Sequence, residues 1–211
     1  MNIIWAIREL CKGENGIENL FDFNKTYEKL IDLSDNKQEA TQFAAMLYGG
    51  AREKVLELIH NAYKYKDYLA DIESSLIKGG MYESEAKRTI EIFLEVFAFP
   101  GYREVDESKI QKIVTEEGDF RTEYIGEVKD GKEHGVGKKT LYYQGEWCNY
   151  YETVWIYGIM YGYEFGKEME FGMYEDKKIG FVANNCLIGK TRIFASSGEE
   201  FNDLGKNINI K

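Results

Sequence analysis

A glycine-and-aromatic unit that occurs twice in the second half of the chain most constrains its fold. The first copy opens at Tyr124 and has its other motif residues at Gly126, Glu127, Gly131, Lys132, Gly135 and Gly137. The second copy opens nineteen residues later and reads Tyr143-Gln144-Gly145-Glu146-Trp147. Units that recur about every twenty residues, with glycines at turns and aromatics between them, are typical of stacked β-hairpins. We therefore expect an array of hairpins that builds a surface.

The chain changes character at its single proline, Pro100. Glycine is sparse before this point and frequent from Gly118 onward. Proline cannot continue a helix and biases Phe99 away from helical angles. We predict an α+β protein with two segregated domains, in which a helical bundle precedes an antiparallel β-hairpin sheet. The predicted boundaries are a bundle at 1–100, a charged connector at 101–117, the hairpin repeats at 118–205 and a tail at 206–211.

Apolar residues recur at helical spacing throughout the first hundred residues, as Val55, Leu58, Ile59 and Ala62 do. Each segment carries one apolar and one charged face, which is typical of a small bundle. Glycine pairs separate several of the segments. The predicted helices cover residues 3–12, 17–33, 36–48, 51–64, 67–78 and 83–99.

The second half instead alternates aromatic or β-branched residues with polar ones. This alternation, broken by glycine and by Asn/Asp/Lys clusters, is typical of strands. Asp130-Gly131 is a strong hairpin-turn signal, because both residues tolerate positive φ. Further turns are expected at 175–178, 184–185 and 196–198.

The stretch from Tyr124 to Gly137 resembles a MORN repeat. The family pattern is an aromatic, any residue, Gly-Glu, a short gap, Gly-Lys and then Gly-x-Gly, and this stretch matches every position. The second copy has Tyr150 and Val154 where the pattern has glycines. Later units, near 171–181 and 187–190, keep only the rhythm, as in the looser bacterial form of the repeat. The resemblance implies a hairpin sheet in which the motif residues, including Gly145, are structural.

The helical half resembles short adaptor modules found in bacterial multidomain proteins. The residues that carry this resemblance are Gly16-Ile17, Leu30-Ile31-Asp32-Leu33, Leu47-Tyr48-Gly49 and Glu83-Ser84-Glu85-Ala86-Lys87. The resemblance transfers no activity. It implies an N-terminal adaptor joined to a variable C-terminal part.

The sequence offers little for catalysis. His60 lies on a predicted helix and is expected to be a partly buried structural residue. His134 falls inside the first repeat and is expected to be a polar turn residue. The alternative is a catalytic dyad with Cys148. Zinc sites need about four ligands, whereas the cysteines and histidines are scattered. Gly189-Lys190-Thr191 resembles the end of a phosphate loop but lacks its first glycine. We expect no enzyme activity, no cofactor and no metal.

Charge and cysteine usage restrict the partners and the compartment. The formal net charge of −10 repels phosphate backbones and anionic lipid, so nucleic acid is not expected and membrane binding is disfavoured. The chain shows no signal-peptide pattern. The cysteines Cys11, Cys148 and Cys186 lie far apart, which indicates free thiols in a reducing compartment. We expect a cytoplasmic protein.

Aromatic residues are concentrated between Tyr142 and Tyr174. In a stack of hairpins, most aromatics pack across strands and replace a thick core. A thin sheet cannot hide this many rings, and the remainder would form a face that binds peptide or protein. The residues predicted to form this face are Tyr143, Trp147, Tyr151, Trp155 and Tyr163.

The leading hypothesis is a non-enzymatic two-part adaptor that binds a protein or peptide. In this hypothesis the helical part docks a partner or self-associates, and the sheet holds an extended segment. One alternative is binding to a membrane-lipid surface through the repeats. The other is a role as an immunity protein or phage counter-defence factor, which suits a compact acidic binder.

Overall fold

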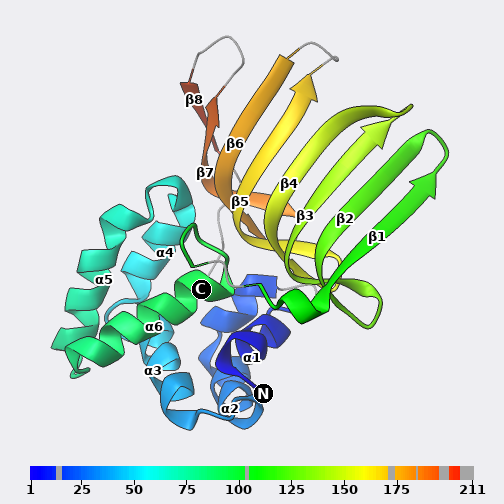
Figure 1. Ribbon diagram of the computed structural model, residues 1–211. Coiled ribbons are helices and arrows are strands. Elements are labelled where there is room, and N and C mark those ends of the chain that lie inside the picture. Colours follow the sequence, from blue (N-terminus) through cyan, green and yellow to red (C-terminus); the bar gives the residue numbers. More distant parts are fainter. Residues whose placement is uncertain (13–15, 103–104, 171–173, 184, 195–199, 205–211) are drawn as a thin grey trace.

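The computed structural model describes the chain except residues 13–15, 103–104, 171–173, 184, 195–199 and 205–211. Helices make up the first part of the chain and an antiparallel sheet makes up the second (Figure 1). This confirms the predicted α+β class with segregated helical and β parts. The predicted tail at 206–211 lies outside the described residues.

The helical part contains six α-helices and two short 3-10 segments among the residues described. The predicted helix at 17–33 divides into η1 and α2, and the one at 51–64 ends as an α-helix at His60 and continues as η2. Side-chain oxygens cap two helices, since Asn2 accepts from the Ile4 amide at 2.7 Å and Asn36 accepts from Glu39 at 3.1 Å. The bounds are α1 Ile3–Leu10, η1 Gly16–Phe21, α2 Phe23–Leu33, α3 Lys37–Tyr48, α4 Arg52–His60, η2 Ala62–Lys64, α5 Lys66–Lys78 and α6 Glu83–Val96.

The sheet has eight strands whose spatial order equals their order in the sequence. Asp130-Gly131 forms the predicted turn, with φ of 52° and 74°. Gln144-Gly145 and Tyr157-Gly158 form turns with the same signs of φ. After η3 (Glu107–Lys109), the strands are β1 Ile110–Glu117, β2 Phe120–Lys129, β3 Lys132–Tyr143, β4 Glu146–Ile156, β5 Ile159–Glu170, β6 Tyr174–Ala183, β7 Cys186–Phe194 and β8 Glu200–Leu204.

The predicted connector at 101–117 is wrong over its last eight residues. Residues 110–117 form β1, which pairs with β2 along its whole length. Only Ile113 in this strand is partly covered, and the other residues are exposed. A strand that is exposed on both faces has no need to alternate apolar and polar residues. Its sequence therefore reads as a charged linker.

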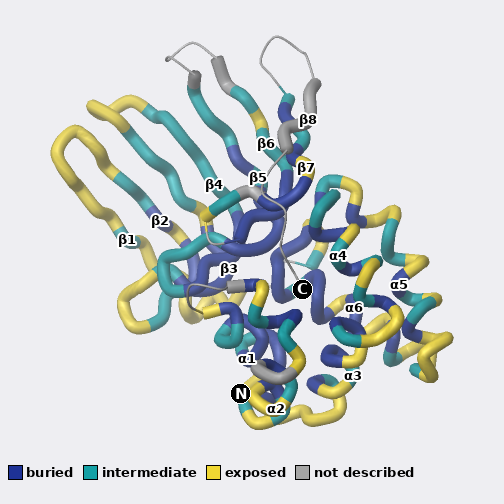
Figure 2. The backbone as a smooth tube through the Cα atoms, turned by 180° about the vertical axis from the view of Figure 1, so that it is seen from behind, coloured by how far each residue is buried: buried dark blue, intermediate teal, exposed yellow. Residues whose placement is uncertain are grey.

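The helices pack against one face of the sheet at one end of its strands. Phe97 lies 5.4 Å from Phe181 between ring centroids, and Phe99 lies 5.3 Å from Tyr163. One hydrophobic cluster includes residues of α1 to α6 and of β3 to β7. Figure 2 shows this buried region where the helices and the strands meet. The two parts thus share a core, and the far ends of the strands extend beyond the helices.

None of the described helices has the length and apolar character needed to cross a lipid bilayer.

Candidate functional site

Two of the five aromatic residues predicted to form a binding face are buried. Trp155 is 2% exposed and Tyr163 is 8% exposed. Tyr163 packs against Phe99, and the Trp155 ring meets Tyr124 edge to face at 5.7 Å. Their prediction as exposed ligand-binding residues is wrong, because the helices cover Tyr163 and Tyr124 occupies the side of Trp155.

The other three do not share one face. Tyr151 pairs with Lys139, whereas its neighbour Tyr150 pairs with Thr140 on the opposite side of the sheet. A bulge between Leu141 and Tyr142 shifts the register and puts Trp147 opposite Tyr142. Trp147 therefore lies on the Tyr150 face, and Tyr151 lies on the other. Tyr143 is 43% exposed and packs on Phe120 at 5.0 Å, at the end of β3.

Trp147 instead forms a pocket with residues that are not among the five predicted to bind. The pocket has a volume of about 350 Å³. The Tyr150 and Phe165 rings meet edge to face, with centroids 6.5 Å apart. The residues of this aromatic pocket are Trp147, Tyr150, Phe165, Lys167 and Met169.

The aromatic pocket lies on the face of the sheet that carries the helices, farther along the strands. Phe165 follows Tyr163 by two residues without a break in the β5–β6 register, so both point to the same side. The alternation of Tyr161, Tyr163 and Phe165 was the sequence signal for this face. This alternation identifies the face that carries the pocket only once one of the three residues is known to contact the helices.

Basic side chains surround the aromatic pocket. One cross-strand row runs from Tyr150 through Lys167 to Lys177. A neighbouring row places Lys138, Glu152, Phe165, Ile179 and Arg192 side by side. Glu152 is the acidic member of these rows, and it accepts a hydrogen bond from the Tyr150 hydroxyl at 2.9 Å. This part of the surface is locally basic on a chain whose net charge is −10.

The opposite face carries a buried carboxylate, Glu164, which is 5% exposed. Burial, together with the nearby Glu168, raises the pKa of Glu164 to about 7 against the opposing effect of Lys178. Lys178 forms a hydrogen-bonded ion pair with Glu168. Glu164 thus keeps its proton in the folded protein over a range in which an ordinary carboxyl group ionises.

Replacing this carboxyl is expected to change how stability depends on pH. The folded protein holds the Glu164 proton between about pH 4.5 and 7, while the unfolded chain releases it. The stability contributed by this group is therefore complete below pH 4.5 and lost as the pH rises through 7. Glu164→Gln should leave stability unchanged at low pH and raise it above pH 7 by up to about 3 kcal/mol.

Urea unfolding of both proteins across this pH range measures the difference. Glu146→Gln, at an exposed position of the same sheet, is the matched control and should give a flat difference. A flat difference for Glu164→Gln as well would contradict the raised pKa.

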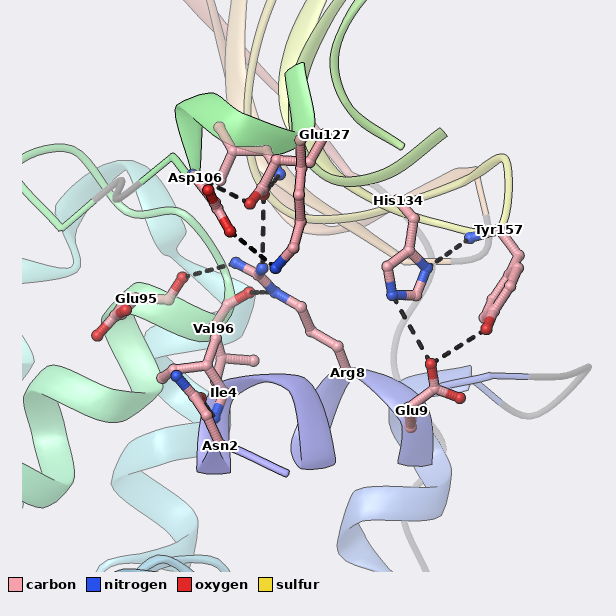
Figure 3. Close-up of polar contacts among 12 residues, drawn as sticks. Asn2, Ile4, Arg8, Glu9, Glu95, Val96, Asp106, Glu127, His134 and Tyr157 are labelled. Atoms are coloured by element: carbon pink, nitrogen blue, oxygen red, sulfur yellow. Dashed lines mark hydrogen bonds and ion pairs between the residues drawn. The ribbon is translucent and has the colours of Figure 1, made fainter. Parts of the chain in front are cut away.

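A buried ion pair ties the first repeat motif to the helices (Figure 3). Arg8 in α1 and Glu127 in β2 are each 3% exposed in their side chains, and Nη1 lies 3.9 Å from Oε2. Arg8 also donates to the carbonyl of Val96 at 3.1 Å and to that of Glu95 at 3.3 Å. The guanidinium therefore joins α1, the end of α6 and the sheet.

The glutamate of the motif also fixes the backbone around it. Glu127 accepts from the amides of Val136 at 2.7 Å and Asp106 at 3.2 Å. Gly135 has φ of 103°, and a Cβ there would overlap the Glu127 carboxylate. Glu127 of the Gly-Glu pair and Gly135, the first glycine of Gly-x-Gly, are thus sterically linked, which gives both residues a structural role.

His134 is buried in an aromatic and charged setting and belongs to the same junction. Its ring stacks on Trp5 at 4.8 Å, and its Nδ1 accepts from the Tyr157 amide at 3.4 Å. Its Nε2 lies 3.7 Å from Glu9, which also accepts from the Tyr157 hydroxyl at 3.2 Å. Burial, assisted by Lys129, lowers the pKa of His134 to about 4. The imidazole is therefore neutral at physiological pH.

The alternative dyad of His134 with Cys148 does not form. Gly135 pairs with Trp155 at one end of β4, and Cys148 lies in the bulge at the other end. His60 is partly buried, as expected, and burial lowers its pKa. Within the part of the chain that the structure describes, no group of three His, Cys, Asp or Glu side chains is placed to hold a metal ion.

Comparison of the chain with protein-family models gave no match, and comparison with curated protein sequences gave none either.

Proposed function

We propose that the chain is a non-enzymatic protein-interaction module with a MORN-like hairpin sheet, and that its aromatic pocket binds an extended acidic peptide segment of a protein partner. The observation that supports this most directly is the pocket of Trp147, Tyr150 and Phe165 on a sheet face with basic residues around it. Tyrosine and tryptophan in such pockets commonly dominate the binding energy of protein interfaces.

The size of the pocket favours one large apolar side chain as the anchor. Its volume of about 350 Å³ is at the lower end of ligand pockets, which range from roughly 300 to 1,000 Å³. The three rings offer edges and faces to an aromatic or aliphatic group. Lys167 at the pocket and Lys138 and Lys177 on the same face favour carboxylates beside that anchor.

The net charge of the chain does not oppose this partner at short range. At physiological ionic strength, fields from exposed charges fall off over about 8 Å. An acidic segment on this face therefore interacts mainly with the local lysines. The scattered cysteines, Cys11, Cys148 and Cys186, favour the cytoplasm as the site of this interaction.

A peptide-display selection on the immobilised protein tests the proposal. Enriched peptides should share an aromatic or aliphatic residue flanked by Asp or Glu. Trp147→Ala should weaken their binding about 30-fold, equivalent to about 2 kcal/mol, because it removes one wall of the pocket. Fluorescence anisotropy with one enriched peptide measures the change.

Tyr143→Ala is the matched control, since it removes an exposed ring outside the pocket, and it should leave affinity within about twofold. Equal losses in both variants, or a selection without a shared pattern, would contradict the proposal.

Flotation with vesicles containing anionic lipid tests the alternative of lipid binding. Flotation that Trp147→Ala abolishes would favour lipid over peptide at this pocket. The third function, immunity or counter-defence, would use the same pocket with a toxin or defence protein as the partner.

A further inference from the structure

The outer edge of β1 pairs with no other strand among the residues that the structure describes. β1 bonds to β2 on one side and is the terminal strand of the sheet (Figure 1). Seven of its eight residues are exposed, including Ile110 at 42% and Val114 at 45%. An edge strand presents a row of backbone donors and acceptors that another strand can use.

Geometry restricts how β1 could pair with a second copy of itself. Around a two-fold axis the two strands run antiparallel, so the sequence numbers of any two opposing residues have the same sum. Outward-pointing backbone groups alternate along a strand, so opposing residues must both point outward or both point inward. This sum is therefore even, which means that the axis passes beside one residue that faces its own counterpart. Two registers pair seven of the eight residues of the strand, and they are centred on Ile113 and on Val114.

Charge selects one of these two registers. Centred on Val114, the pairing places Lys112 opposite Glu116 of the second copy, and the two-fold axis produces this pair twice. Centred on Ile113, the same lysine faces Val114 and Glu116 faces Ile110, so neither charge meets its opposite across the axis. Lys109, which would face Glu117 in that register, belongs to η3 and lies outside the strand. Opposite charges directly across two strands stabilise their pairing, so the register centred on Val114 is favoured.

We propose that β1 pairs with β1 of a second copy about an axis at Val114, which joins two sheets into one continuous sheet. The apolar side chains fit this register, because the exposed Val114 meets its own counterpart and Ile113 faces Thr115. Cross-strand pairs of β-branched residues are favourable. The partner is thus a second copy of this chain.

The charges of the neighbouring strand extend the same pattern. Within one copy, Arg121 on β2 lies 3.8 Å from Glu116, and Lys112 lies 3.0 Å from Glu123. Across the axis, Arg121, Glu116 and Lys112 of the second copy would form a row of alternating sign. Glu116 then lies between two basic residues, Arg121 of its own copy and Lys112 of the second copy.

Sedimentation velocity of two single variants, alone and mixed, tests the pairing. In a dimer of the Lys112→Glu variant, each new glutamate faces Glu116 of the other copy. In a dimer of the Glu116→Lys variant, each new lysine faces Lys112 of the other copy. Each variant alone should dimerise at least about tenfold more weakly than the unchanged protein. An equimolar mixture restores both opposite-charge pairs and should recover the dimer. An unchanged protein that stays monomeric throughout, or a mixture without recovery, would overturn the proposal.

Cysteine cross-linking tests the register itself. With Cys148 and Cys186 replaced by serine, Val114→Cys should form a disulfide-linked dimer on oxidation, since the two Cβ atoms face each other. Glu116→Cys should form none, because it faces Lys112. Circular dichroism confirms that each variant is folded. Cross-linking of Glu116→Cys with none for Val114→Cys would overturn this register. The aromatic pocket takes no part in any of these results.

Discussion

Gly162→Ala is expected to lower the free energy of unfolding by about 4 kcal/mol. Gly162 has φ of 94°, and a Cβ there would lie 2.5 Å from the carbonyl oxygen of Phe97. That carbonyl also accepts from the Tyr163 amide at 2.7 Å, which holds the two backbones together. The carbonyl oxygen belongs to the main chain and the position of a Cβ is fixed by its own backbone, so a side-chain rotation cannot relieve the overlap. Urea unfolding followed by circular dichroism measures the loss.

Gly145→Ala separates the steric overlap from the backbone strain. Gly145 has φ of 83°, and a Cβ there meets no atom within 4 Å. Its replacement should cost only the strain of positive φ, about 1 kcal/mol. Equal losses at Gly162 and Gly145 would show that the helices and the sheet do not approach closely at Phe97.

Glu127→Ala is expected to lower the free energy of unfolding by about 4 kcal/mol as well. The substitution leaves the buried Arg8 guanidinium without its counter-ion and the Val136 amide without its acceptor. Removing one partner of a buried pair commonly costs about 3–5 kcal/mol. Burial already lowers the pKa of Arg8, and Glu127 is the largest influence opposing that shift. Chemical unfolding at neutral pH measures the loss.

A double-mutant cycle with Arg8→Met shows whether the ion pair accounts for this loss. Methionine fills a similar volume without charge, so the second substitution should recover about 1–3 kcal/mol in the Glu127→Ala background. Glu127→Gln keeps an oxygen for the Val136 amide and should cost less than alanine. Strictly additive effects would mean that Glu127 acts only through the backbone amides.

Local signals in the sequence were enough to predict a helical part that precedes a β part. Gly79-Gly80 follows the end of α5 directly, whereas α6 ends at Val96, before the predicted end at Phe99. Asp130-Gly131 forms the predicted turn. β1 was missed because local alternation is absent where both faces of a strand are exposed. Pattern alone could not separate this strand from a charged linker.

The binding face was harder to predict, because register decides which aromatics share it. Bulges between Leu141 and Tyr142 and between Glu152 and Val154 shift the pairing of β4 with both of its neighbours. The shift at Leu141 and Tyr142 is one residue and moves side chains between the faces, and no local pattern marks its position. Burial of Tyr163 depended on where the helices pack, which involves residues distant in sequence. Trp147 was the one candidate that the structure places in the aromatic pocket.

The sequential strand order has a consequence for how the chain folds during synthesis. Every strand pairs with its neighbour in sequence, so each hairpin can form soon after its second strand leaves the ribosome. Helix α1 is made well before the sheet, yet Arg8 contacts Val96 and Glu127, which are made much later. Helix α1 also packs on η1 and α2, which directly follow it, so it can join the other helices early, while Arg8 completes its contacts only after β2 has been made. The buried ion pair is thus among the last contacts of the helical part to form.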